Sequence, residues 1–188
     1  MTCFMLMKSI VRTFPWQLVQ FQRTVVHSPD HTISRQHDKQ VKMRHFVQFF
    51  SDTDLLMSQI HPATLRYNEQ GTPVSNVFDD VYFSNESGLD ETQFVFLHNN
   101  QLPERWQQLP KRCFHVIETG FGPGLNFLVC WQAFRQFRAA HPQARCQQLH
   151  FSTFEKFPLT LHDLTQALTA WPTLRELVAE LLAQYPRP

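Results

Sequence analysis

One stretch, from Phe114 to Phe127, constrains the fold of this chain more than any other. An apolar run ends there in an acid, Glu118, and three glycines follow at alternate positions before an apolar pattern of helical spacing begins. A strand, a glycine turn and a helix start form the corner at which α/β proteins bind nucleotides, because glycine reaches positive φ and lets the backbone approach a ligand. The stretch therefore predicts an α/β fold with a ligand site at Gly120, Gly122 and Gly124.

The spacing of the glycines discriminates between cofactors. A dinucleotide site has the pattern Gly-x-Gly-x-x-Gly and directs a helix N-terminus at a pyrophosphate, whereas this chain has Gly-x-Gly-x-Gly after an acid. The Glu118 carboxylate would repel a diphosphate and attract the cationic methionine part of S-adenosylmethionine (SAM). The spacing favours SAM, and a glycine-rich turn without a ligand remains the alternative at this point.

Residues 118–127 also resemble motif I of the methyltransferase domain in the MnmC family of bifunctional tRNA-modifying proteins. Three further stretches agree with that family in the same order, at residues 78–85, 88–92 and 154–159. Pro123 departs from the family pattern, which usually has threonine at that place. Proline lacks a backbone N–H and fixes φ, so we expect this turn to hold its ligand less well.

The resemblance implies a set of SAM contacts. Glu155, at the end of the second predicted strand, would bind the two ribose hydroxyls, because one carboxylate accepts both hydrogen bonds. Lys156 would flank the adenine or be solvated, and Tyr82 would line the cofactor pocket or merely anchor a loop. The predicted cofactor-binding residues are Tyr82, Glu118, Gly120, Gly122, Gly124, Leu125, Asn126, Glu155 and Lys156.

The resemblance further implies a reaction, in which a methyl group passes from SAM to the exocyclic amine of 5-aminomethyl-2-thiouridine. That base is the wobble uridine of certain tRNAs, and the product is 5-methylaminomethyl-2-thiouridine. Orientation of a neutral amine supplies most of the catalysis, and a nearby acid steers the amine proton. The family carries that acid in a loop after a later strand, of the type Asp-Gly-Phe-Ala-Pro, and this sequence contains no such stretch. The catalytic residue is therefore unknown.

By the resemblance, the chain corresponds to the N-terminal half of a Rossmann-like SAM-dependent methyltransferase fold. The family's FAD-dependent oxidase domain also has no counterpart here. Two alternatives to an active tRNA methyltransferase stay open. One is a catalytically inactive SAM-binding remnant, and the other is an interaction fragment that docks an exposed apolar helix stripe, Leu174 to Leu182, on a partner.

Two parts of the chain differ in character. Residues 58–188 are predicted to be the partial methyltransferase domain. Residues 1–57 contain no glycine and are predicted to be a polar and partly disordered extension without family counterpart. We expect the natural start to lie nearer Met57. The histidines of the extension (His27, His31 and His37) match no ligand spacing, so no metal site is predicted.

Charge and composition exclude little else. A net charge of +1 gives no electrostatic sign of nucleic acid, so the tRNA partner rests on the resemblance alone. No apolar run is long enough to span a membrane. The four cysteines form no Cys-x-x-Cys pair and no signal peptide is evident, which favours reduced thiols in a cytoplasmic protein. The oligomeric state cannot be predicted.

Periodicity and turn residues predict the secondary structure. We expect a hairpin over 63–74, a short helix over 88–98 and a polar connection over 99–112. The helix should bury Leu89, Val95 and Phe96, with Thr92 as a further candidate for its inner side. Strands are predicted at 113–118 and 149–154, flanking a helix over 125–138 with Arg135 and Arg138 on its solvent side. Two final helices should begin with capping boxes at 160–163 and 173–176.

Overall fold

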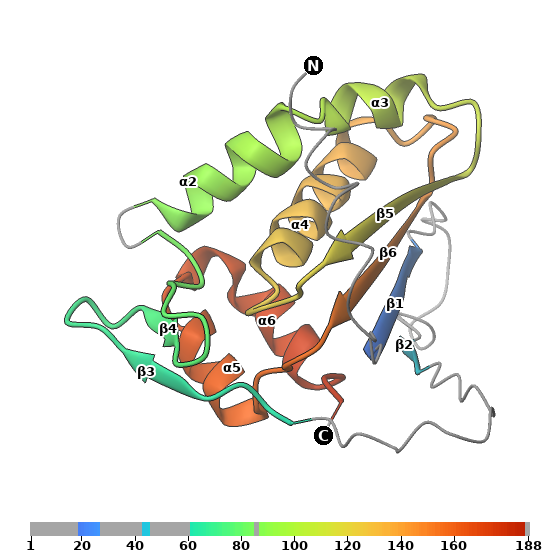
Figure 1. Cartoon of the computed structure of the whole chain (residues 1–188). Coiled ribbons are helices and arrows are strands. Elements are labelled where there is room, and N and C mark those ends of the chain that lie inside the picture. Colours follow the sequence, from blue (N-terminus) through green and yellow to red (C-terminus); the bar gives the residue numbers. More distant parts are fainter. Residues whose placement is uncertain (1–18, 27–42, 46–60, 85–86, 187–188) are drawn as a thin grey trace, which may run out of the picture.

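The computed structural model describes residues 19–26, 43–45, 61–84 and 87–186 (Figure 1). Within them the chain is a mixed α/β structure with two sheets. The elements in chain order are β1 (Val19–Val26), β2 (Met43–His45), β3 (Leu65–Tyr67), β4 (Pro73–Ser75), α2 (Gly88–Thr92), the π-helix η1 (Gln93–His98), α3 (Leu102–Gln108), β5 (Cys113–Thr119), α4 (Leu125–Ala140), β6 (Gln148–Glu155), α5 (Leu161–Leu168), the 3₁₀-helix η2 (Pro172–Leu174) and α6 (Arg175–Leu182).

The larger sheet has the strand order β2-β1-β6-β5. β5 and β6 are parallel, with His115 opposite His150, and α4 connects them as the sequence predicted. β1 runs antiparallel to β6 from Val19 to Val26, so the sheet is mixed. Both β1 and β2 come from the segment that was predicted to be an extension, and the boundary at residue 57 stays a prediction.

The helices lie on one side of this sheet, and α4 runs along β5 and β6 (Figure 1). The core forms where the inner side chains of the two strands meet the apolar side of α4, on which Leu128 and Phe134 are fully buried. The predicted apolar stripe of this helix is thereby confirmed. Alternate residues of β5 point the other way, and Ile117 is 73% exposed there.

The prediction of a polar connection over 99–112 is wrong, because α3 forms within it. Leu102 and Trp106 are four residues apart and therefore lie on one side of the helix, while Pro103 is tolerated in the first turn, where its missing N–H has no partner to lose. The Trp106 ring is completely buried, with its centroid 5.1 Å from that of Phe134. α3 thus closes the core at the start of β5.

Helix 88–98 is confirmed, and Leu89 and Thr92 lie on its inner side as predicted, whereas Val95 and Phe96 do not. The second half is a π-helix, in which the hydrogen bonds span five residues, as in the bond from Asn99 N–H to the Phe94 carbonyl. This wider turn changes the phase of the side chains after Thr92, so Leu97 packs against the core in place of Val95 and Phe96. Val95 and Phe96 are 40% and 44% exposed.

Arg138 is another correction, since it is 4% exposed and not on the solvent side of α4. Its guanidinium donates to the carbonyls of His141 and Pro142, both at 2.9 Å, and to those of Ala144 and Cys146 at 3.3 Å. The Arg138 side chain therefore donates hydrogen bonds to backbone oxygens in the loop that leads into β6, and these bonds explain why it is buried. Arg135 keeps a half-exposed position beside Glu180.

At the C-terminal end, α5 begins with the predicted capping box, in which Thr160 Oγ1 accepts from Asp163 N–H at 3.1 Å. The second box does not form, because η2 precedes α6 and makes Leu174 its N-cap residue. The stripe that was considered for docking is packed inside the molecule, with Leu174, Leu177 and Leu181 each below 5% exposed. It offers no free apolar side for a partner. None of the described helices combines the length and the hydrophobicity that crossing a bilayer requires.

Candidate functional site

The site begins at the corner between β5 and α4. After the parallel strand ends, Gly120, Gly122 and Gly124 all have positive φ, at +86°, +50° and +73°. At Gly124 the glycine is required twice over, since an added Cβ would lie 2.5 Å from Cζ of the buried Phe121 ring. The compact turn leaves open space beside Gly120, where an added Cβ would meet no atom within 4 Å.

Pro123 is accommodated in this turn without loss of its closing hydrogen bond. The Gly124 N–H donates to the Phe121 carbonyl at 2.8 Å, so the turn does not use a donor at position 123. The predicted weakening of ligand binding by Pro123 concerns a ligand contact and stays a prediction.

Glu155 occupies the end of the neighbouring parallel strand and bends toward the glycines. Its Oε2 accepts from the Gly122 N–H at 3.0 Å, and its Oε1 accepts from the Phe157 N–H at 2.9 Å. Each carboxylate oxygen can accept a second hydrogen bond. The side chain is therefore fixed in orientation and still has acceptor capacity for a ligand.

Glu118 has a different environment, although it also ends a strand. Its Oε1 accepts from Asn126 Nδ2 at 2.8 Å, and its Oε2 is buried without a hydrogen-bond partner among the described residues. Burial raises the pKa of Glu118 to about 7, while the hydrogen bond from Asn126 lowers it and the Glu155 carboxylate raises it further. A buried carboxylate with an unused oxygen attracts a hydrogen-bond donor or a positive charge.

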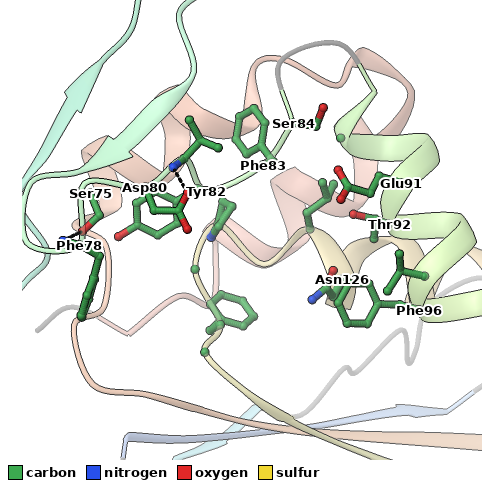
Figure 2. Close-up of a pocket in the computed structure, with 18 of the residues that line it drawn as sticks. Ser75, Phe78, Asp80, Tyr82, Phe83, Ser84, Glu91, Thr92, Phe96 and Asn126 are labelled. Atoms are coloured by element: carbon green, nitrogen blue, oxygen red, sulfur yellow. Dashed lines mark hydrogen bonds between the residues drawn. The ribbon is translucent and has the colours of Figure 1, made fainter. Parts of the chain in front are cut away.

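Glu155, Asn126, Gly120 and Gly122 border a cavity of about 990 Å³. Figure 2 shows its two walls, with Phe78 and Tyr82 on one side and Glu91, Thr92 and Phe96 on the other. The Tyr82 ring packs over the turn, because its Cδ1 lies 3.2 Å from the place a Cβ would take on Gly122. Desolvation, with a smaller effect of the Glu155 carboxylate, raises the pKa of Tyr82, so the phenol stays protonated at neutral pH.

Six of the nine predicted cofactor contacts line this cavity: Tyr82, Gly120, Gly122, Leu125, Asn126 and Glu155. The other three do not. Glu118 lies behind Asn126, Gly124 is buried beneath the Phe121 ring, and Lys156 is exposed with its Nζ 5.0 Å from the centre of the Phe157 ring.

The resemblance implies that residues 88–98 lie near the substrate pocket, with a weak role for Glu91, and Glu91 does line the cavity. Four other lining residues were not predicted there. Thr92, Val95 and Phe96 come from α2 and η1, and Phe157 follows β6. Their side chains were expected in the core or not assigned at all. The one available signal was the run of three apolar residues from Phe94 to Phe96, which a helix cannot bury entirely on one side.

Comparison with known proteins identifies the chain's relatives. No family model matches it. The tRNA 5-methylaminomethyl-2-thiouridine biosynthesis bifunctional protein MnmC of Vibrio vulnificus strain YJ016 is 57% identical over 130 residues, which are 69% of this chain and 19% of that protein. The MnmC protein of Aliivibrio fischeri is 54% identical over 132 residues, which are 70% of this chain and 19% of that protein.

This chain is homologous to one region of MnmC. The resemblance inferred from the ordered motifs is therefore confirmed. The chain spans about a fifth of the length of these MnmC relatives, so the homology is partial. The name of these relatives connects MnmC to the biosynthesis of a modified tRNA base.

Proposed function

We propose that residues 58–188 form the SAM-binding, Rossmann-like part of an MnmC-type methyltransferase domain, which acts on the aminomethyl group of wobble 5-aminomethyl-2-thiouridine in tRNA. The observation that carries this proposal is the Glu155 carboxylate, which lies at the end of a parallel strand, lines the cavity and is held 3.0 Å from the Gly122 N–H. In nucleotide-binding α/β folds, an acid in this position binds ribose hydroxyls.

The residues of the cavity fit SAM in size and in chemistry. Its volume of about 990 Å³ is at the upper end of the usual range for small-molecule sites. Glu155 offers acceptors for two hydroxyls, and Gly120 leaves space against the turn. Phe78 and Phe157, whose ring centroids are 6.0 Å apart, offer apolar surface beside Glu155 for the adenine.

The methionine part of SAM would bind on the side of Asn126. Glu118 engages the Nδ2 of this amide, which leaves Oδ1 as the acceptor for the ligand's ammonium group. The buried Oε2 of Glu118 adds negative charge behind it. A cation bound there would lower the pKa of Glu118 toward its ordinary value, since opposite charges favour ionisation.

Bound SAM supplies an electrophilic methyl group on a sulfonium centre. The part of the protein described here would bind and orient this group, while the rings of Tyr82 and Phe96 would exclude water from the two opposite walls of the cavity. The residue that takes the amine proton stays unassigned. SAM binding without methyl transfer is the alternative.

Isothermal titration of the whole chain with SAM tests the proposal. Glu155→Gln places an amide where two backbone N–H groups donate, so we expect SAM affinity to fall about 10- to 100-fold, in line with the loss of one or two hydrogen bonds to a charged group. Glu180→Gln, on the exposed side of α6, is the matched control and should bind SAM as the unchanged chain does.

Methyl transfer is measured separately, with labelled SAM and tRNA that carries 5-aminomethyl-2-thiouridine. Label on the tRNA supports the full activity. SAM binding without transfer supports the inactive remnant, and a folded chain that binds no SAM refutes both.

A further inference from the structure

A second group of chemically reactive side chains lies on the larger sheet, away from the cavity. Cys113 and His115 are two residues apart on β5 and therefore point to the same face. His150 on β6 is directly opposite His115 in the parallel register. One sulfur and two imidazole nitrogens, one from each residue, lie within 4.8 Å of one another.

We propose that Cys113, His115 and His150 form a binding site for a divalent transition metal of the zinc type, with a fourth coordination position open to solvent. The sequence predicted no metal site, because its spacing of two and then thirty-five residues matches no known ligand pattern. The register between β5 and β6 is what brings the three ligands together.

The ligand types select the metal. Thiolate and imidazole together favour zinc and similar ions over calcium or magnesium, which prefer oxygen. Three protein ligands with an open position are typical of zinc sites that bind water or a further ligand. Partial exposure of the group provides access, since His115 is exposed and the other two residues are half-buried.

The geometry is close to what coordination needs. Tetrahedral zinc with Zn–S of about 2.3 Å and Zn–N of about 2.1 Å separates sulfur from nitrogen by about 3.6 Å. Cys113 Sγ lies 3.4 Å from His115 Nε2. The ring centroids of His115 and His150 are 4.7 Å apart, and their planes differ by 54°, so rotation about the side-chain bonds can direct both rings at one ion.

A cysteine binds zinc as its thiolate, so metal binding exchanges the Cys113 thiol proton for the metal, and the proton leaves to solvent.

This site is independent of the proposed SAM site. Cys113 begins β5, whereas Glu118 lies near its opposite end, about 17 Å farther along the strand, and the glycines follow that end. The side chains of the cluster also share a face with Ile117, which is not the face that α4 covers. A metal here would fasten β5 to β6.

The test uses the whole chain without an affinity tag, freed of metal by a chelator and titrated with Co²⁺. We expect one equivalent to bind and to give a thiolate-to-cobalt charge-transfer band in the near ultraviolet. Cys113→Ser should abolish the band, and His115→Ala should weaken Co²⁺ binding at least tenfold. His162→Ala is the control, because His162 is an exposed histidine on α5.

Zinc provides a second measurement. It should raise the melting temperature of the unchanged chain and of His162→Ala, but not that of His150→Ala. A charge-transfer band that survives Cys113→Ser, or no Co²⁺ binding by the folded chain at micromolar concentrations, would overturn the proposal. Neither result would bear on SAM binding, because the two sites share no residue.

Discussion

Replacement of single glycines by alanine separates the two physical reasons for glycine in this chain. Gly71 and Gly124 have nearly the same backbone conformation, with φ of +78° and +73°. At Gly71, in the turn between β3 and β4, an added Cβ meets no atom within 4 Å. At Gly124 the added Cβ would lie 2.5, 3.0 and 3.1 Å from three atoms of the Phe121 ring. The two substitutions therefore share the strain and differ in the clash.

The magnitudes follow from these contacts. A non-glycine residue in the left-handed region costs about 1–2 kcal/mol, and this is the whole expected effect of Gly71→Ala. Overpacking a core adds about 1–3 kcal/mol. The Phe121 ring cannot move aside at little cost, because it is 5% exposed and its centroid is 6.3 Å from those of both Phe127 and Tyr185. We therefore expect Gly124→Ala to lower the free energy of unfolding by about 2–5 kcal/mol.

Thermal unfolding followed by circular dichroism measures the difference. For a chain of this size, 1 kcal/mol corresponds to about 2–4 °C in melting temperature. Gly71→Ala should thus lose a few degrees, and Gly124→Ala roughly two to three times as much. Equal melting temperatures for the two variants would refute the reasoning, because the strain alone would then explain both.

Gly120→Ala extends the series to function. Its φ of +86° predicts a loss of stability close to that of Gly71→Ala, and its Cβ would enter open space beside the cavity. If the proposed SAM site is correct, this variant loses affinity for SAM while Gly71→Ala keeps it. A Gly120→Ala chain that binds SAM normally would mean that the ligand does not lie against the turn.

Three further predictions concern buried polar groups. Glu118 has a pKa of about 7 in the folded chain, against an ordinary value of 4.5, so folding favours its protonated form. The resulting contribution to the free energy of unfolding is complete below pH 4.5. It is lost as the pH rises through 7, and the loss amounts to about 3 kcal/mol. Denaturant titrations at pH 5 and 8 should show this loss in the unchanged chain and not in Glu118→Gln. Arg138→Met removes the guanidinium donor from four carbonyls and should lower the free energy of unfolding by about 2–5 kcal/mol in the same titration. Arg135→Met breaks only the exposed 3.8 Å pair with Glu180 and should lower it by under about 1 kcal/mol. Tyr185→Phe removes a buried 3.0 Å hydrogen bond to the Leu159 carbonyl and should cost about 1–2 kcal/mol, seen as a lower denaturation midpoint.

Local sequence signals were sufficient for one side of the site. The strand before Glu118, the glycine turn and the helix after it follow from an apolar run, three residues with positive φ and a helical stripe. Each of these signals is complete within a few residues, and here the tertiary contacts agree with it. The same holds for the hairpin at Asn68 to Gly71, whose turn is closed by the Asn68 side chain.

The opposite side of the site depends on tertiary structure and could not be predicted. Phe96 reads as a core residue, but the change from α-helix to π-helix after Thr92 turns it toward the cavity. Trp106 lies in a proline-containing segment whose sequence is typical of a loop, so its burial was not predicted. It packs against Phe134, twenty-eight residues later in the chain. Arg138 carries a charge that predicts exposure, and only the path of the following loop shows why it is buried.

The two strand-end acids illustrate why a shared signal does not give a shared role. Glu118 and Glu155 each follow an apolar strand, and the sequence assigned both to the cofactor. In the structure Glu155 meets two backbone N–H groups at the cavity wall, which stabilise its charge where a ligand can reach it. Glu118 has one amide partner and a buried, unpaired oxygen, so burial sets its pKa near 7. Hydrogen bonding from the backbone suits the first acid to hold neutral hydroxyls, whereas desolvation makes the second a group whose charge depends on what binds beside it. A cationic ligand would therefore be bound more tightly above pH 7 than below it, and Glu118→Gln should remove that difference while Glu155→Gln should not.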